Sequence, residues 1–345
     1  MHYKLDPFFN FLNEEREKKP NELAEAAPAI FYKIRDKKRE LLKTVIGLDK
    51  LERYAFDTSC NRCTATKVSR ARIIPHGEER SGDWPDISIE RFGMEILPGL
   101  TMPFYIIRSS CSSAQKVVLY CHGHGEGGLR DCFVNAGQYH KNMPHTLAMR
   151  GYTVFAFEPA GFGHFKIDDY ANQDETRCHS LSMRLLLYGM TALGLRVFQT
   201  KCLADHMRAN YSVNKNAIVG ISGGGTVCML YGAIYDDVFA SVISCYSNTF
   251  KASIMAMHHC ICNAVPGIME AGDIPDIIAM SAPKKLFLQS GINDPIYPVD
   301  GARSAYAFVK SIYEKLGIPE NVKSDFFDGA HEFNNSLIDW LDSLE

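Results

Sequence analysis

The residues best suited to chemistry surround Ser222, in the segment Gly220-Ile221-Ser222-Gly223-Gly224. This segment matches G-x-S-x-G, and it lies between the apolar run 217–219 and a stretch of helical character at 226–235. Glycines suit such a sharp turn, because it brings backbone segments too close together for side chains. The turn exposes the serine hydroxyl and directs the amino end of the next helix at a developing oxyanion. The pattern therefore predicts a nucleophilic serine, although a glycine-rich helix cap is the simpler alternative.

Two more candidate residues follow later apolar runs. Asp294 lies in the loop after residues 285–288, and His331 comes just after residues 323–327. Taken singly, these would be a turn aspartate before proline and a surface histidine. Taken with the serine, they give the order Ser, Asp, His, with each residue directly after a separate predicted strand. That is the chain order of a Ser-His-Asp triad on an α/β sheet.

The acid of this triad has rivals in the sequence. Asp328 is less suitable, because it lies on the same short segment as His331. Glu270 and Asp273 also stay open, because the acid of such a site can follow the preceding strand instead.

The elements that must position these residues begin near residue 85. Short apolar runs then alternate with helical stretches, a pattern that predicts an α/β fold with a mostly parallel sheet covered by helices on both faces. In such sheets, chemistry collects at the carboxyl ends of the strands. The expected strands are 87–96, 102–108, 116–120, 152–157, 217–221, 242–245, 285–288 and 323–327, the first two joined by a turn at Pro98-Gly99.

The first part of the chain, to about residue 80, is expected to be helical and without strands. Asn21 is a candidate helix cap, and Pro28 is expected to interrupt or restart the helix. Aliphatic residues then recur at roughly helical spacing: Ile30, Ile34, Leu41, Leu42 and Val45. We therefore predict a helical N-terminal extension (1–80) and an α/β domain (81–345) with a cap insertion at about 248–280.

Composition narrows the functional class. The chain has 345 residues, 46% of them hydrophobic, and a formal net charge of −3. This net charge does not indicate binding to nucleic acid or to an acidic membrane surface. No apolar run is long enough to span a bilayer. Residues 1–20 lack the pattern of a signal peptide, and the eleven cysteines are scattered. We predict reduced thiols, a cytoplasmic location and an uncharged or weakly charged small-molecule substrate. The sequence does not decide the oligomeric state.

Two groups of possible metal ligands are interpreted as ordinary side chains. Cys60-Asn61-Arg62-Cys63 has the C-x-x-C form, but no second pair follows at zinc-finger spacing. His258-His259-Cys260-Ile261-Cys262 crowds histidine and cysteine together. Adjacent residues on a helix or strand do not converge on one ion, so the sequence predicts no metal site.

Five segments, 121–125, 158–163, 220–225, 282–298 and 329–333, resemble the α/β-hydrolase superfamily. The similarity is to the branch that contains dienelactone hydrolases, acetyl xylan esterases and prolyl-oligopeptidase-like proteins, and it covers the chain from about residue 85. It implies that Ser222 attacks an acyl carbon, His331 takes its proton and Asp294 orients the imidazole. It also implies that the backbone N–H groups of Gly223 and His124 form the oxyanion hole. No metal or organic cofactor is implied.

One departure from that branch bears on the reaction. Dienelactone hydrolases use cysteine as the nucleophile, whereas this chain has Ser222. We therefore expect hydrolysis of carboxylic esters through an acyl-enzyme. A peptidase or amidase of the prolyl-oligopeptidase type is the first alternative, although no propeller domain precedes the candidate triad. A non-catalytic ligand-binding protein of the same fold is the second, and the presence of all three candidate residues argues against it.

Overall fold

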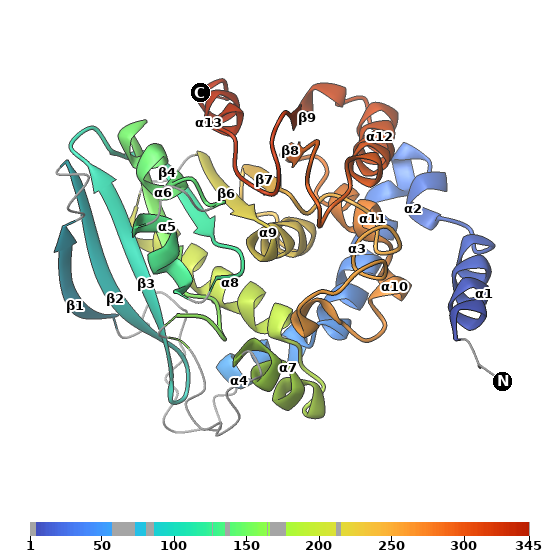
Figure 1. The fold of residues 1–345 in the computed structure, drawn as a ribbon, viewed down its shortest axis with the longest axis horizontal. Helices are drawn as coiled ribbons and strands as arrows, with labels where there is room; N and C mark the ends of the chain where they lie inside the picture. Colours follow the sequence, from blue (N-terminus) through green and yellow to red (C-terminus); the bar gives the residue numbers. More distant parts are fainter. Residues whose placement is uncertain are drawn as a thin grey trace.

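The computed structural model describes residues 5–56, 73–80, 86–125, 127–134, 139–163, 165, 177–211 and 215–344. Its centre is a nine-stranded sheet of order β1-β2-β3-β5-β4-β6-β7-β8-β9 (Figure 1). The β1–β2, β2–β3 and β3–β5 pairs are antiparallel. The β5–β4, β4–β6, β6–β7, β7–β8 and β8–β9 pairs are parallel. The strands are β1 (Ile73–Arg80), β2 (Ile87–Leu97), β3 (Leu100–Ser109), β4 (Ser113–Cys121), β5 (Tyr152–Phe157), β6 (Lys215–Ile221), β7 (Ala240–Ser244), β8 (Lys285–Gly291) and β9 (Val322–Phe327).

The sheet confirms the predicted fold class and corrects one boundary. Each of the eight expected strands overlaps a strand of the sheet, but β1 lies where the sequence predicted helix. Its residues, Ile-Ile-Pro-His-Gly-Glu-Glu-Arg, lack an alternation of apolar and polar types. The strand forms through main-chain pairing with β2, with one register shift between Pro75 and Gly77. Pairing with a neighbour, which local sequence does not encode, determines the structure there.

Helices cover both faces of the sheet (Figure 1). Alternate residues of β4 divide between two cores. Val117 and Leu119 face the core that includes α8, α9, α11 and α12, while Val118 and Tyr120 face the core that includes α6 and α13.

Among the described residues, no single helix is long and apolar enough to cross a membrane, although the bent pair Cys178–Leu187 and Ala192–Asn210 meets that test together. The helices are α1 (Asp6–Glu17), α2 (Glu22–Glu25), α3 (Pro28–Val45), α4 (Leu48–Phe56), α5 (Asp131–Val134), α6 (Met143–Met149), α7 (Arg177–Leu187), α8 (Ala192–Asn210), α9 (Gly223–Ile234), α10 (Ile268–Ala271), α11 (Ile274–Ala279), α12 (Val299–Lys315) and α13 (Ser336–Asp342), with short 3₁₀ turns η2 (Gly128–Arg130), η3 (Ile261–Asn263) and η4 (Pro319–Asn321).

Of the N-terminal helices, α3 packs against α9 and α10, and α4 packs against α8. As expected, Asn21 caps α2 by accepting a hydrogen bond from the Ala24 N–H, and α3 restarts at Pro28. The aliphatic residues at helical spacing do not all mark the buried face of α3, since Ile30 is 49% exposed. The buried residues of α3 are Phe31, Arg35, Arg39 and Leu42.

An ion pair explains why α3 buries arginine. The Arg39 guanidinium donates to both carboxylate oxygens of Asp236, just beyond α9, at 2.7 and 2.6 Å. These bonds lower the pKa of Asp236 against the opposing effect of burial. Aliphatic spacing alone misses such a face, because the apolar stems of arginine cover core surface while the head group finds its partner.

Candidate active site

The turn at Ser222 joins β6 directly to α9. Ser222 has φ 56° and ψ −121°, a conformation that L residues rarely adopt. Its N–H donates to the carbonyl oxygen of Ser244, at the end of β7, at 3.0 Å. A Cβ on Gly220 would collide with the Gly224 carbonyl, and one on Gly224 would collide with the Cys121 carbonyl. Close backbone approach therefore requires both glycines of the motif. The helix begins at Gly223 and not at 226 as predicted, so its amino end directly follows the serine.

The loop after β4 is packed against this turn. A Cβ built on Gly223 would lie 2.7 Å from His124 Nδ1 and 3.8 Å from the His124 backbone nitrogen. The Tyr139 hydroxyl donates to the His124 carbonyl at 2.5 Å, which fixes the orientation of the loop. The main chains of Gly223 and His124 are thus close neighbours. Tyr139 was not identified from the sequence, where nothing marks it.

His331 and Asp294 meet at the same end of the sheet. His331 Nδ1 lies 2.8 Å from Asp294 Oδ2, and the Asp294 side chain is fully buried. The other carboxylate oxygen accepts from the N–H groups of Ile296 and Tyr297, at 2.8 and 3.0 Å. Three hydrogen bonds therefore fix the carboxylate, and the carboxylate in turn fixes the imidazole.

Two of the rival acids, Asp328 and Asp273, have other partners. Asp328 accepts from the Asn293 side chain at 3.2 Å. Asp273 is the N-cap of α11 and accepts from the N–H groups of Ile274 and Phe250. Among the acids that the sequence left open, Asp294 is the one hydrogen-bonded to His331.

Aromatic rings and a thiol surround the imidazole. The rings of Tyr297 and Tyr139 lie 5.7 and 5.5 Å from that of His331. The Cys245 sulfur lies within 4.8 Å of the His331 and Asp294 donor atoms. Burial, reinforced by the Asp294 charge, raises the pKa of Cys245 to about 12, so this cysteine is a neutral thiol at physiological pH. Cys245 follows β7 directly, and the strand-end rule that selected the other residues would have found it.

The five predicted site residues thus occur in two adjoining groups. Ser222, Gly223 and His124 meet at the β6–α9 turn, while Asp294 and His331 meet after β8 and β9. Strands β6 to β9 are consecutive and parallel, so both groups lie at the same carboxyl edge of the sheet. A hydroxyl on a strained turn and an imidazole oriented by a carboxylate are the components of nucleophilic catalysis.

Strand order and the turn that carries Ser222 define an α/β-hydrolase fold. A model of the Abhydrolase family matches residues 83–335, so the chain belongs to this family. No curated protein matches the chain in sequence.

Solved structures share the fold at low sequence identity. A Bacteroides fragilis protein assigned as an acetyl xylan esterase aligns with a TM-score of 0.72 and 14% identity, covering 98% of this chain and 95% of its own. The methylesterase BT1017 aligns with a TM-score of 0.67 and 17% identity, over 96% and 65% of the two chains. An acetyl xylan esterase from Paenibacillus sp. R4 gives 0.57 and 13%, over 87% and 94%. At these identities the likeness establishes the fold.

Proposed function

We propose that this protein is a serine hydrolase that cleaves carboxylic esters through an acyl-enzyme. The observation that carries the proposal is the His331–Asp294 hydrogen bond of 2.8 Å, formed at the sheet edge where the β6–α9 turn presents Ser222. Family membership and the esterases among the solved structures support the same reaction class.

The roles follow from the chemistry of each group. Ser222 Oγ attacks the acyl carbon while His331 Nε2 removes its proton, and the ester C–O bond then breaks as His331 protonates the leaving alcohol. Water, activated by the same imidazole, hydrolyses the acyl-enzyme and frees the acid. Asp294 keeps the proton on His331 Nδ1 and stabilises the imidazolium without itself becoming protonated.

The oxyanion is stabilised by backbone donors. The N–H groups of Gly223 and His124 are the proposed pair, in keeping with the close packing of these two main-chain segments. Gly223 also opens α9, whose amino end carries partial positive charge. Loss of one such donor typically reduces transition-state stabilisation by about 3–4 kcal/mol.

The proposed substrate is a small ester without strong charge. The free thiols of the described cysteines favour a reducing, cytoplasmic setting, and no metal or organic cofactor takes part in the proposed reaction. A panel of substrates should identify the acyl and alcohol groups that the enzyme accepts. The panel runs from acetyl to octanoyl esters and includes acetylated xylan oligosaccharides.

The test is reaction of the folded protein with a fluorophosphonate, followed by mass spectrometry to locate the adduct. We expect a single adduct on Ser222 and none in the Ser222→Ala variant. A label elsewhere would contradict the assignment of the nucleophile. Folded protein that neither labels nor hydrolyses any ester of the panel would instead indicate a binding protein of the same fold.

A further inference from the structure

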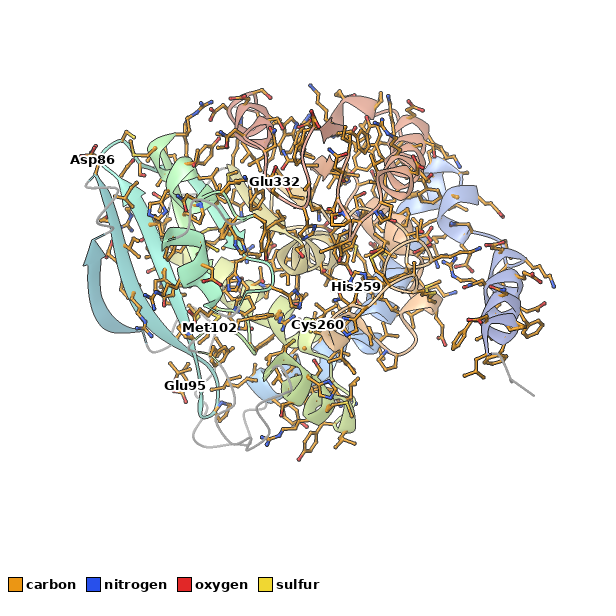
Figure 2. All side chains as sticks on the ribbon, in the orientation of Figure 1. Asp86, Glu95, Met102, His259, Cys260 and Glu332 are labelled. Carbon is orange, nitrogen blue, oxygen red and sulfur yellow. The ribbon has the colours of Figure 1, made fainter. Side chains whose placement is uncertain are left out.

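Four possible metal ligands from three distant parts of the chain converge beside the candidate active site. They are His124 in the loop after β4, Cys178 in α7, and Cys260 and Cys262 at η3. Their donor atoms all lie within 4.8 Å of one another. Cys260 is labelled in Figure 2, and η3 contacts both α7 and α8. We propose that these residues bind one structural zinc ion.

The distances fit a tetrahedral ion. With Zn–S bonds of about 2.3 Å, sulfur atoms on a tetrahedron lie about 3.8 Å apart, and nitrogen lies slightly closer to sulfur. The Cys178 and Cys260 sulfurs are 3.3 Å apart, and His124 Nε2 is 3.2 Å from the Cys262 sulfur. Small outward movements of four side chains would open this cluster to the size of a Cys₃His zinc site.

The charge around the cluster suits an anionic site. Arg196 is 1% exposed, and its Nη2 donates to the Cys178 sulfur at 3.1 Å. Nε and Nη2 both donate to the Ala160 carbonyl, and the guanidinium lies 4.7 Å from the centre of the Phe162 ring. The hydrogen-bond acceptors of the guanidinium are thus a neutral carbonyl and the Cys178 sulfur. Three thiolates, a neutral imidazole and Zn²⁺ carry a net charge of −1, which would balance this buried cation.

A disulfide explains less of the arrangement. A bond between Cys178 and Cys260 would use two of the four donors and leave His124, Cys262 and the Arg196 charge unexplained. Zinc engages all four, and the three thiol protons pass to solvent as it binds. The prediction of no metal site assumed that adjacent residues do not converge. Here Cys260 precedes η3 and Cys262 lies within it, and distant residues complete the set.

The site would link two functional parts of the molecule. Cys260 and Cys262 belong to the proposed cap insertion, whereas the main chain of His124 is a proposed oxyanion donor. One ion bound to all three would hold the insertion and the oxyanion loop together. Zinc binding does not depend on the proposed hydrolase reaction, so either proposal can fail while the other stands.

The experiment measures metal in the full-length protein, purified under reducing conditions without added chelator. Elemental mass spectrometry should find about one zinc per chain, and both Cys260→Ala and Cys262→Ala should lose at least about 90% of it. Cys202→Ala is the matched control, because it removes a buried thiol of α8 away from the cluster. It should retain the full content.

Measurements on the unmodified chain guard against variants that fail to fold. After chelation, Co²⁺ added alone should give the thiolate charge-transfer and strong d–d absorption of a tetrahedral site, and Zn²⁺ should raise Tm by about 5 °C or more. The proposal is overturned if zinc is absent and Zn²⁺ leaves Tm unchanged, or if both cluster variants bind as much metal as the control. A Cys178–Cys260 disulfide in protein that binds no Zn²⁺ would overturn it in favour of a redox pair.

Discussion

The candidate active site and the Cys₃His cluster share one loop but are assembled by different means. Ser222, Asp294 and His331 each follow a parallel strand, so the sheet determines where they meet. The cluster draws on a loop, a helix and an insertion, and His124 alone connects it to the sheet. The candidate active site can therefore be predicted from the order of residues along the chain, because a regular sheet positions it. The Cys₃His cluster cannot, because irregular segments bring its residues together.

The largest expected effect is the loss of turnover in Ser222→Ala, which also tests whether the candidate active site and the Cys₃His cluster act separately. Ser222→Ala should lower kcat by at least about three decades, because the acyl-enzyme cannot form. Alanine also has a Cβ, so the strained φ of 56° is no worse and Tm should hardly change. Ester turnover, Tm and zinc content should be compared with those of the parent protein. Near-normal turnover would remove Ser222 from the mechanism, and a loss of zinc would contradict the separation of the two clusters.

The next effect concerns the acid. Asp294→Asn should lower kcat by about two decades or more, because a neutral amide neither holds the correct tautomer of His331 nor stabilises its charged form. Asp328→Asn is the matched control, since its carboxylate bonds to Asn293 and should leave kcat within about twofold. Steady-state kinetics on one activated ester suffices. Equal losses in the two variants would mean that the assignment of the acid is wrong.

A smaller effect measures how far the cluster supports the active site. Cys262→Ala should lower kcat by no more than about tenfold, because it loosens the loop that carries His124 without removing a reacting group. The same variant should lower Tm by about 5 °C, the stabilisation expected from a bound ion. Kinetics and thermal unfolding with and without chelator test both parts, with Cys202→Ala as control. A loss of activity as large as that of Ser222→Ala would place the cluster in the chemistry itself.

Sequence reasoning succeeded where one physical rule governs position. The strands of the parallel sheet form as predicted, and Ser222, Asp294 and His331 follow β6, β8 and β9 as expected. Their catalytic roles remain predictions. Sequence reasoning failed where a partner distant in sequence decides. The β1 strand exists through its pairing with β2, and α3 buries Arg39 because Asp236 lies opposite. Cys260 and Cys262 gain significance only beside Cys178 and His124. The possible ligands Cys60 and Cys63 lie outside the described residues.

The smallest expected effect is the pH dependence of folding stability that arises from buried histidines, as distinct from that caused by metal binding. His140 and His145 are fully buried, and burial lowers their pKa values to about 3 and about 4. In the unfolded chain each titrates near 6.5, so the unfolded state binds more protons as the pH falls below that value. The stability from keeping these residues neutral is fully present above pH 6.5 and is lost as the pH falls toward 4.

Between pH 7.5 and 5.5, each histidine should lower the free energy of unfolding by about 1.4 kcal/mol. Guanidinium unfolding at the two pH values measures this. Cys262→Ala is the suitable background, because protonation of zinc-bound thiolates cannot contribute there. His145→Leu in that background should reduce the pH dependence by the share of one histidine, about 1.4 kcal/mol. Stability equal at both pH values would show that these histidines are not buried neutral groups. A pH dependence confined to the zinc-bound parent would assign acid sensitivity to the metal cluster instead.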